Sequence, residues 1–308
     1  MFVREILLLC HGDTKADKRA GDVARSLKSR SKRQAQKLGS WLQTNGLAPD
    51  ITLAAPTEGA RVSAEKALKA GGGTARDIVE VSRLCRASVV DQISALSERA
   101  APRMLCSGSF DTLTNLLHHL APDAPSLRPG TLAQVQLRDE QLHEGTGQVK
   151  RIVAADDLPD GFPYPGPGGS ERRPRPAYYY TQSAALSYRH HKGALQILLV
   201  TSSSGRKWVI PKGICEPGLT PQESAAKEAL EEAGIVGQIG EACIGCYDHA
   251  KWGATCKVAV YPMLVTKMLS DKKWDESHRK RKWVSPNQAS ARVAHPDLAA
   301  IIAGFRTR

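Results

Sequence analysis

A break in the middle of the chain constrains its fold more than any other feature of the sequence. The segment from Asp160 to Pro176, DGFPYPGPGGSERRPRP, is dense in proline, glycine and charge, and shows neither helical nor strand periodicity. Such a composition is typical of a linker. The 308 residues are enough for two domains, because one domain usually contains roughly 100–200 residues. We therefore predict two domains, at residues 1–158 and 177–308, joined by a linker at 159–176.

The residues before the break alternate between short apolar runs and amphipathic segments. The runs fit buried parallel strands, and the segments carry apolar residues at helical spacing. Predicted strands lie at Ile6–Leu9, Ile51–Ala54 and Arg103–Cys106, predicted helices at Ser31–Leu42, Arg61–Ala70 and Thr112–Leu120, and a strand pair at 131–154. Strands that alternate with helices predict an α/β layered domain.

The residues after the break predict a sheet with few helices. The best-marked helix begins at Pro221, where Thr220 is a favourable N-cap and Glu223 completes a capping box. Gly234 follows its last turn, as is typical of a helix C-terminus. Predicted strands lie at 184–188, 196–201, 207–210, 244–247 and 257–266, and a last helix begins at Asn287. This order predicts an α+β domain.

Three glutamates share one face of the helix that begins at Pro221. Glu228 lies three and four residues before Glu231 and Glu232, so its side chain neighbours both. Like charges at this spacing repel, whereas a bound Mg²⁺ takes carboxylate oxygens together with substrate phosphates. The pattern therefore fits either a divalent-cation site or a solvated acidic helix face.

The sequence around these glutamates resembles the Nudix box, G-x5-E-x7-R-E-U-x-E-E-x-G-U with U aliphatic. Residues 211–235 read PKGICEPGLTPQESAAKEALEEAGI. The matching positions are Gly213, Glu228, Glu231, Glu232, Gly234 and Ile235. Two positions differ from the box, because Leu219 replaces its first glutamate and Lys227 replaces its arginine. Lysine keeps the charge of arginine but loses its bidentate hydrogen bonding.

This resemblance implies a Nudix fold, a mixed sheet sandwiched by helices, that cleaves a diphosphate linkage. It implies that Glu228, Glu231 and Glu232 hold Mg²⁺, with Mn²⁺ as an alternative, and that Glu231 and Glu232 are catalytic. Two further segments, at 207–213 and 274–283, resemble the diphosphoinositol- and diadenosine-polyphosphate branch of the family. The branch resemblance favours dinucleoside polyphosphates as substrates, with inositol pyrophosphates as the second choice.

Four more residues belong to the predicted site. Gly213, Lys212 and Arg206 are expected to bind substrate, the two cations as charge-assisted donors to phosphate oxygens. Glu276, in the segment at 274–283, is the candidate for an extra metal ligand or a general base. The three charged side chains are also consistent with solvated surface groups.

The start of the chain resembles a second family. LLLCHGDT resembles the strand and R-H-G element of the histidine phosphatases, and in particular the small phosphohistidine phosphatases. The resemblance implies a three-layer α/β fold over residues 1–158, with His11 as the nucleophile. Cys10, Gly59 and Ser109 stand where this family has two arginines and a second histidine, which stabilise the transferring phosphoryl group. The domain is therefore predicted to be degenerate and inactive, with His11 and Cys10 in a vestigial site.

Two alternatives to the predicted enzyme stay open. Arg25 and Arg61 lie near the lost cations and keep an active phosphatase possible, and His11 is also consistent with a structural role. The other alternative is a non-catalytic protein that senses phosphorylated ligands or binds RNA. The net charge of +12 suits either kind of partner, but aromatic residues make up only 5% of the chain. Because RNA-binding sheets need exposed aromatic side chains, a polyphosphate substrate is favoured over nucleic acid.

The cysteines and the hydropathy predict the location of the protein. An odd number of cysteines, seven, without a secretory signal favours reduced thiols in the cytoplasm. Cys243 and Cys246 form a C-x-x-C that lacks the second ligand pair of a structural zinc site, so we interpret them as strand and turn residues. The sequence contains no run of about 18 apolar residues, and we expect no membrane span. The oligomeric state is not predicted.

Overall fold

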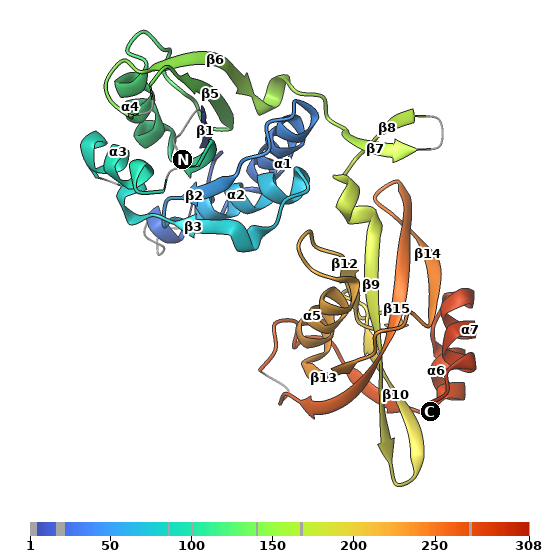
Figure 1. The fold of residues 1–308 in the computed structure, drawn as a ribbon. Helices are drawn as coiled ribbons and strands as arrows, with labels where there is room; N and C mark the ends of the chain where they lie inside the picture. Colours follow the sequence, from blue (N-terminus) through green and yellow to red (C-terminus); the bar gives the residue numbers. More distant parts are fainter. Residues whose placement is uncertain are drawn as a thin grey trace. The chain divides into compact units, whose positions relative to one another are not determined.

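The chain consists of two compact units, Met1–Arg172 and Arg173–Arg308 (Figure 1). We describe them separately from a computed structural model, which describes residues 5–16, 22–85, 87–99, 101–139, 141–166, 169–270 and 273–307. The division between the units falls inside the segment at 159–176 that the sequence assigns to a linker. Among the described helices, none is long and apolar enough to cross a bilayer.

The first unit is built on a six-stranded sheet. Its strands are β1 (Glu5–Cys10), β2 (Ile51–Ala54), β3 (Ile78–Glu80), β4 (Arg103–Gly108), β5 (Thr131–Leu137) and β6 (Gly147–Ala154). They follow the order β3-β2-β4-β1-β5-β6, in which the first four are parallel and β5 and β6 join antiparallel. The carboxyl ends of β1, β2 and β4 therefore meet at one edge, where ligands bind in open α/β sheets.

Helices cover both faces of this sheet. They are α1 (Ser29–Thr44), α2 (Glu58–Ala70), α3 (Val89–Ser97) and α4 (Phe110–Leu120), with short 3₁₀ helices at Asp22–Ala24, Ala75–Asp77, Ser82–Leu84 and Ala155–Asp157. Leu7 of β1 packs with Leu38 of α1 and Ala67 of α2. Ile6 packs in a second cluster with residues of α3 and α4, among them Leu117. Because neighbouring strand residues point to opposite faces, the apolar residues of β1 after Glu5 serve two cores.

The elements that the sequence predicts for the first unit are present, with shifted ends. Helix α2 begins at Glu58, before the predicted Arg61, because the hydroxyl of Thr57 accepts a hydrogen bond from the amide of Ala60 and caps the helix there. The predicted strand pair at 131–154 corresponds to β5 and β6. Helix α3, of nine residues, and β3, of three, were not predicted, because elements this short carry little periodicity.

The segment at 159–176 is more ordered than a bare linker. It contains β7 (Phe162–Gly166) and β8 (Gly169–Arg173), which pair in a two-stranded sheet. Phe162 is 1% exposed, and the guanidinium of Arg33 lies 5.1 Å from the centre of its ring. The beginning of the predicted linker therefore belongs to the packing of the first unit.

The second unit is built on a mixed eight-stranded sheet. Its strands are β9 (Thr181–His191), β10 (Ala194–Thr201), β11 (Trp208–Val209), β12 (Lys212–Ile214), β13 (Ile235–Ile239), β14 (Gly245–Lys251), β15 (Ala254–Met268) and β16 (Arg281–Val284). The central order is β11-β10-β9-β15-β13, while β12 pairs with β9, β14 with β15 and β16 with β10. Strands β9 and β15 are parallel, and the other pairs are antiparallel.

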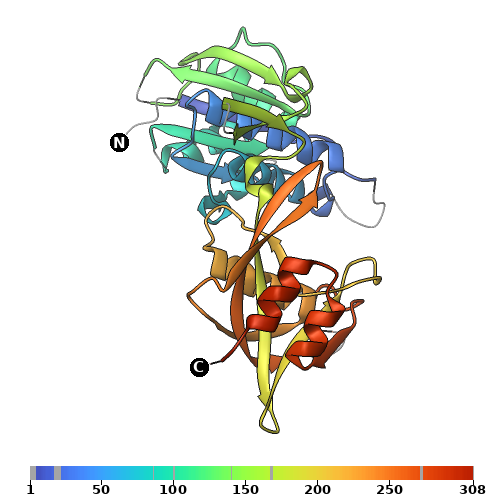
Figure 2. The same ribbon diagram turned by 90° about the vertical axis from the view of Figure 1, so that its right-hand side faces the viewer.

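Three α-helices flank this sheet. Helix α5 (Pro221–Ala233) lies on one side, and α6 (Pro286–Arg292) and α7 (Pro296–Gly304) lie on the other (Figures 1 and 2). A short 3₁₀ helix at Ala177–Tyr180 precedes β9. The prediction of one last helix from Asn287 is wrong, because the chain leaves the helix before Pro296. Proline lacks the N–H that a continuous helix needs, and it disfavours helical conformation at the residue before it.

Candidate active site

Hydrogen bonds at its first turn fix where α5 begins. The Thr220 hydroxyl accepts a hydrogen bond from the amide of Glu223 at 3.1 Å, and the Glu223 carboxylate accepts one from the amide of Thr220 at 2.8 Å. At the other end Gly234 adopts φ +60°, and a Cβ there would lie 2.8 Å from the ring of Trp274. These local interactions fix both ends of α5, so the direction in which its acidic face points is also fixed.

The carboxylate of Glu228 lies directly against the backbone of β12. A Cβ on Gly213 would lie 1.9 Å from Glu228 Oε1, so only glycine permits this approach. Burial, with the charges of Glu232 and Glu231, raises the pKa of Glu228 to about 7. No basic side chain pairs with Glu228 among the described residues.

Glu232 is held by a buried network of hydrogen bonds. Its carboxylate accepts from Arg279 Nη2 at 2.8 Å and from the amide of Lys212 at 3.1 Å. Glu232 and Arg279 are 9% and 8% exposed. Burial raises the pKa of Glu232, and the guanidinium opposes the rise. Arg279 also donates to the carboxylate of Glu276 and to the carbonyl of Thr201, so Glu276 is joined to Glu232 through one guanidinium.

Glu231 pairs with the lysine that replaces the arginine of the box. Lys227 Nζ lies 2.9 Å from the Glu231 carboxylate and 3.7 Å from that of Glu216. Leu219 cannot offer this lysine a carboxylate, but Glu216, three residues earlier in the same loop, does. Sequence comparison with the box missed Glu216, because a fixed spacing does not reveal a substitute at another position.

The three glutamates do not converge on one point. Within the described part of the chain, no group of three His, Cys, Asp or Glu side chains is arranged to hold a metal ion. Glu231 and Glu232 turn toward Lys227 and Arg279, which leaves Glu228 as the carboxylate without a basic partner. A hard divalent cation fits this donor set, because it would replace the proton that burial favours on Glu228 and draw on oxygen ligands alone.

Two of the three predicted substrate-binding residues lie at this site. Lys212 and Gly213 are in β12, and burial lowers the pKa of the Lys212 side chain. Arg206 is exposed in the turn between β10 and β11. A pocket beside Lys212 lies between β11, β14 and the residues that lead into α7, and Arg206 does not line it. Its neighbour Lys207, in the segment at 207–213, lines that pocket, and so does His249. The sequence did not assign either residue to substrate binding.

The carboxyl edge of the first sheet holds the second predicted site. His11, Arg25, Gly59 and Ser109 line a cavity of about 400 Å³ there. The ring of His11 lies over Gly59, where a Cβ would approach it to 3.2 Å. His11 Nδ1 lies 2.9 Å from the carbonyl oxygen of Gly12, to which it donates, so Nε2 is the nitrogen left for a ligand.

Cys10, which the sequence assigns to the vestigial site, does not line this cavity. Neither does Arg61, one of the two arginines considered as replacements for the lost cations. Cys10 packs in the core with Ile6, and burial raises the pKa of its thiol to about 12. Arg61 pairs with Glu58 at 2.7 Å and does not line the cavity. Of the two arginines proposed to compensate for the lost cations, Arg25 is therefore the one at the cavity.

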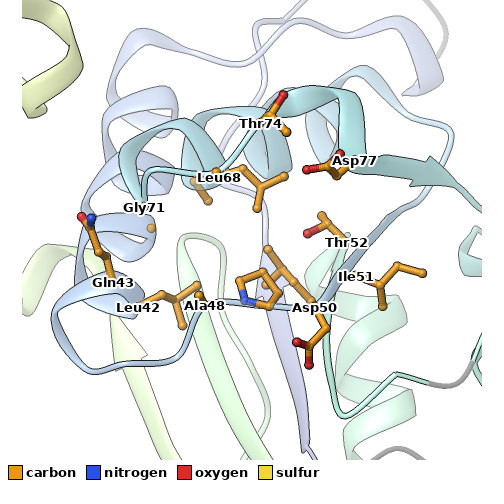
Figure 3. A pocket seen from close by; sticks show the side chains of 15 residues that line it. Leu42, Gln43, Ala48, Asp50, Ile51, Thr52, Leu68, Gly71, Thr74 and Asp77 are labelled. Atoms are coloured by element: carbon orange, nitrogen blue, oxygen red, sulfur yellow. The ribbon is translucent and has the colours of Figure 1, made fainter. Parts of the chain in front are cut away.

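Another cavity of the first unit lies between α1, α2 and the start of β2 (Figure 3). Asp50 and Asp77 are charged groups of its lining, and no basic residue is found among the described lining residues. It lies at the amino end of β2, whereas His11 follows the carboxyl end of β1. A phosphorylated ligand is therefore better matched by the cavity at His11.

The C-x-x-C pair lies at the start of β14. The sulfur atoms of Cys243 and Cys246 are 3.7 Å apart, and both side chains are exposed. No metal-binding group forms around them among the residues that the structure describes.

Known proteins resemble the second unit in sequence. Residues 181–305 match the family model of the NUDIX domain. Nudix hydrolase 16, mitochondrial, of Arabidopsis thaliana is 35% identical over 121 residues, which are 36% of this chain and 66% of the relative. Diphosphoinositol polyphosphate phosphohydrolase 3-alpha of Homo sapiens is 29% identical over 117 residues, 37% of this chain and 69% of that protein. For Nudix hydrolase 12, mitochondrial, of A. thaliana the match spans half of the relative.

Solved structures resemble parts of the chain. A C. elegans Ap4A hydrolase binary complex aligns with a TM-score of 0.37 and 22% sequence identity. The alignment covers 41% of this chain and 99% of the hydrolase chain. The protein histidine phosphatase SixA complexed with tungstate has a TM-score of 0.40 at 18% identity and covers 50% of this chain and 98% of its own.

The family assignment therefore rests on the sequence match and on the geometry around α5. Two of these relatives are Nudix hydrolases by name, and the third is a phosphohydrolase, which supports the prediction of a pyrophosphohydrolase. The second unit of this chain contains a NUDIX domain, at residues 181–305.

Proposed function

We propose that the second unit is a pyrophosphohydrolase that depends on a divalent cation, Mg²⁺ or Mn²⁺. The observation that carries this proposal is Glu228, a half-buried carboxylate with a raised pKa, two acidic neighbours and no basic partner among the described residues. When bound, the cation neutralises phosphate charge and activates water. Glu228 would be the principal ligand of the cation, with Glu231 and Glu232 as its other ligands.

The other residues of the site orient these groups. Arg279 fixes the carboxylate of Glu232, and its second partner, Glu276, is the candidate base or further ligand. Lys212 lies beside Glu232 and supplies a cation to substrate phosphates. The substrate we favour is a dinucleoside polyphosphate, with an inositol pyrophosphate second, because the chain carries a net charge of +12 and its relatives include a diphosphoinositol polyphosphate phosphohydrolase.

Isosteric substitution of the helix glutamates tests the proposal. Glu231→Gln and Glu232→Gln should each lower turnover by at least about 100-fold, the order seen when a preorganised charged group is removed. The measurement is hydrolysis of a panel of dinucleoside polyphosphates, nucleotide sugars and inositol pyrophosphates, with Mg²⁺ and with a chelator. Glu241→Gln, at an exposed position beyond α5, is the matched control. Full turnover in both helix variants, or in the chelator, would refute the site.

We also propose that the first unit is a degenerate histidine-phosphatase-like domain in a cytoplasmic protein. His11 keeps the orientation of a nucleophile, since Nδ1 donates to a backbone carbonyl. Near it the described cavity lining offers one guanidinium, that of Arg25, where the family has two arginines and a second histidine. This arrangement supports retention of the cavity without phosphoryl transfer.

A further inference from the structure

Cys243 and Cys246 lie together at the start of β14, and neither residue belongs to the carboxylate site. Their sulfur atoms are 3.7 Å apart, and both side chains are exposed. A disulfide bond is about 2.0 Å long, so the two sulfur atoms must approach by about 1.7 Å to form one. Side-chain rotation at two exposed positions can supply a shift of this size. The two cysteines are therefore free thiols that are close to the geometry of a disulfide.

The sheet holds the two cysteines beside each other. The amide of Ile244, which lies between them in the sequence, donates to the carbonyl oxygen of Val260 in β15 at 2.9 Å. Cys246 pairs with Ala259 in the ladder between β14 and β15. Once Cys243 or Cys246 has reacted, the other sulfur is already next to it, so the second reaction is intramolecular and fast.

The two thiols do not ionise independently. Cys243 Sγ donates to the carbonyl oxygen of Gly245 at 3.1 Å, which leaves its sulfur as the acceptor for the Cys246 thiol. The pKa of Cys246 is raised by slight burial and by the hydrogen bond and charge of Cys243, while the charge of Lys257 opposes the rise. One sulfur therefore carries a charge while the other keeps its proton, as in a pair of an attacking and a resolving cysteine.

The other five cysteines are less accessible than this pair. Cys10, Cys106 and Cys256 are buried, and Cys85 and Cys215 are half-buried. Burial raises the pKa of the Cys10 and Cys106 thiols to about 12 and the pKa of the Cys215 thiol to about 11. Because the thiolate is the reactive form of cysteine, an oxidant in solution reacts first with the exposed pair.

We propose that Cys243 and Cys246 form a redox-active dithiol, which small disulfides in solution oxidise reversibly to an intramolecular disulfide. In the first step, one cysteine thiolate attacks a sulfur of the small disulfide, forms a mixed disulfide and releases one small thiolate. The other cysteine then loses its proton, attacks the cysteine sulfur of the mixed disulfide and releases the second small thiolate. Two protein thiols are oxidised, the small disulfide is reduced to two thiols, and the two protons pass to these leaving groups. This inference does not depend on the proposed function of either unit.

Mass spectrometry of the full chain tests the proposal without turnover. The native protein is incubated with oxidised glutathione, alkylated and digested with trypsin, which leaves these two cysteines and no other in the peptide 228–251. We expect this peptide to escape alkylation and to lose the mass of two hydrogen atoms, and we expect dithiothreitol to restore both thiols. A peptide that stays fully alkylated, or a disulfide that forms only when the protein is unfolded in urea, would overturn the proposal.

Serine variants distinguish this pair from the other thiols. Cys243→Ser and Cys246→Ser should each accumulate at least about tenfold more mixed disulfide with glutathione than the wild type, because no second sulfur displaces the glutathione. The controls Cys85→Ser and Cys215→Ser should form the intramolecular disulfide to within about twofold of the wild type. Equal amounts of mixed disulfide in the wild type and the single variants would refute the pair. Loss of the disulfide in Cys215→Ser would also refute it, since Cys215 would then be a partner.

Discussion

Glu228 shows how one residue can couple cation binding to stability. Its carboxyl group has an ordinary pKa of 4.5 and a pKa of about 7 in the fold, because burial and two acidic neighbours disfavour the charge. As pH rises, the unfolded side chain therefore loses its proton before the folded one does. The folded state is stabilised below pH 4.5, loses that stability between about pH 4.5 and 7, and regains it only if a cation binds.

We expect the second unit, without divalent cation, to lose on the order of 2–3 kcal/mol of stability between these pH values. Glu228→Gln should remove this dependence, and Mg²⁺ should raise the stability of the wild type above pH 7. Thermal unfolding followed by tryptophan fluorescence measures the stability of the second unit, since Trp208, Trp252, Trp274 and Trp283 all lie in this unit. Identical pH profiles for wild type and variant would contradict the assignment.

At the scale of elements, β12 and α5 are in close contact at Gly213, because glycine has no side chain to separate the strand from Glu228. Gly213→Ala would put a methyl group 1.9 Å from Glu228 Oε1 and displace the carboxylate. Turnover should fall at least about tenfold, and the Mg²⁺ concentration for half-maximal activity should rise. Gly304→Ala is the control, since a Cβ there meets nothing within 4 Å. Equal activity of both variants would show that the close approach is not needed.

The same pair shows what a sequence can predict. Helix α5 was predicted with its observed bounds, because its capping box and terminal glycine act over a few residues. The pocket lined by Lys207, His249 and His295 was not predicted, because these residues are far apart in the sequence and meet only when β14 packs beside the residues that precede β11 and α7. Arg279 was missed as the partner of Glu232 for the same reason. Local hydrogen-bonding chemistry is readable in a sequence, whereas long-range electrostatic partners require the sheet topology.

For the whole molecule, the two units should differ in activity. His11→Ala should leave hydrolysis of a diphosphate substrate by the full chain within about twofold of wild type, because His11 lies in the first unit and has no role in the α5 site. The full chain should also show no phosphatase activity toward phosphohistidine or aryl phosphates in the Glu231→Gln background. Turnover of either phosphoester that His11→Ala abolishes would mean that Arg25 suffices for phosphoryl transfer.

The parallel pairing of β9 with β15 bears on how the protein is made. Thr181 pairs with Lys257, so the centre of the second sheet cannot close until β15 has been synthesised. The first unit, whose last sheet strand ends at Ala154, is complete much earlier. Domains fold as units during synthesis, and pairings between distant strands form slowly. During translation the edge of β9 that pairs with β15 and the part of β10 that pairs with β16 therefore wait for these later strands, and chaperone dependence should concentrate in the second unit.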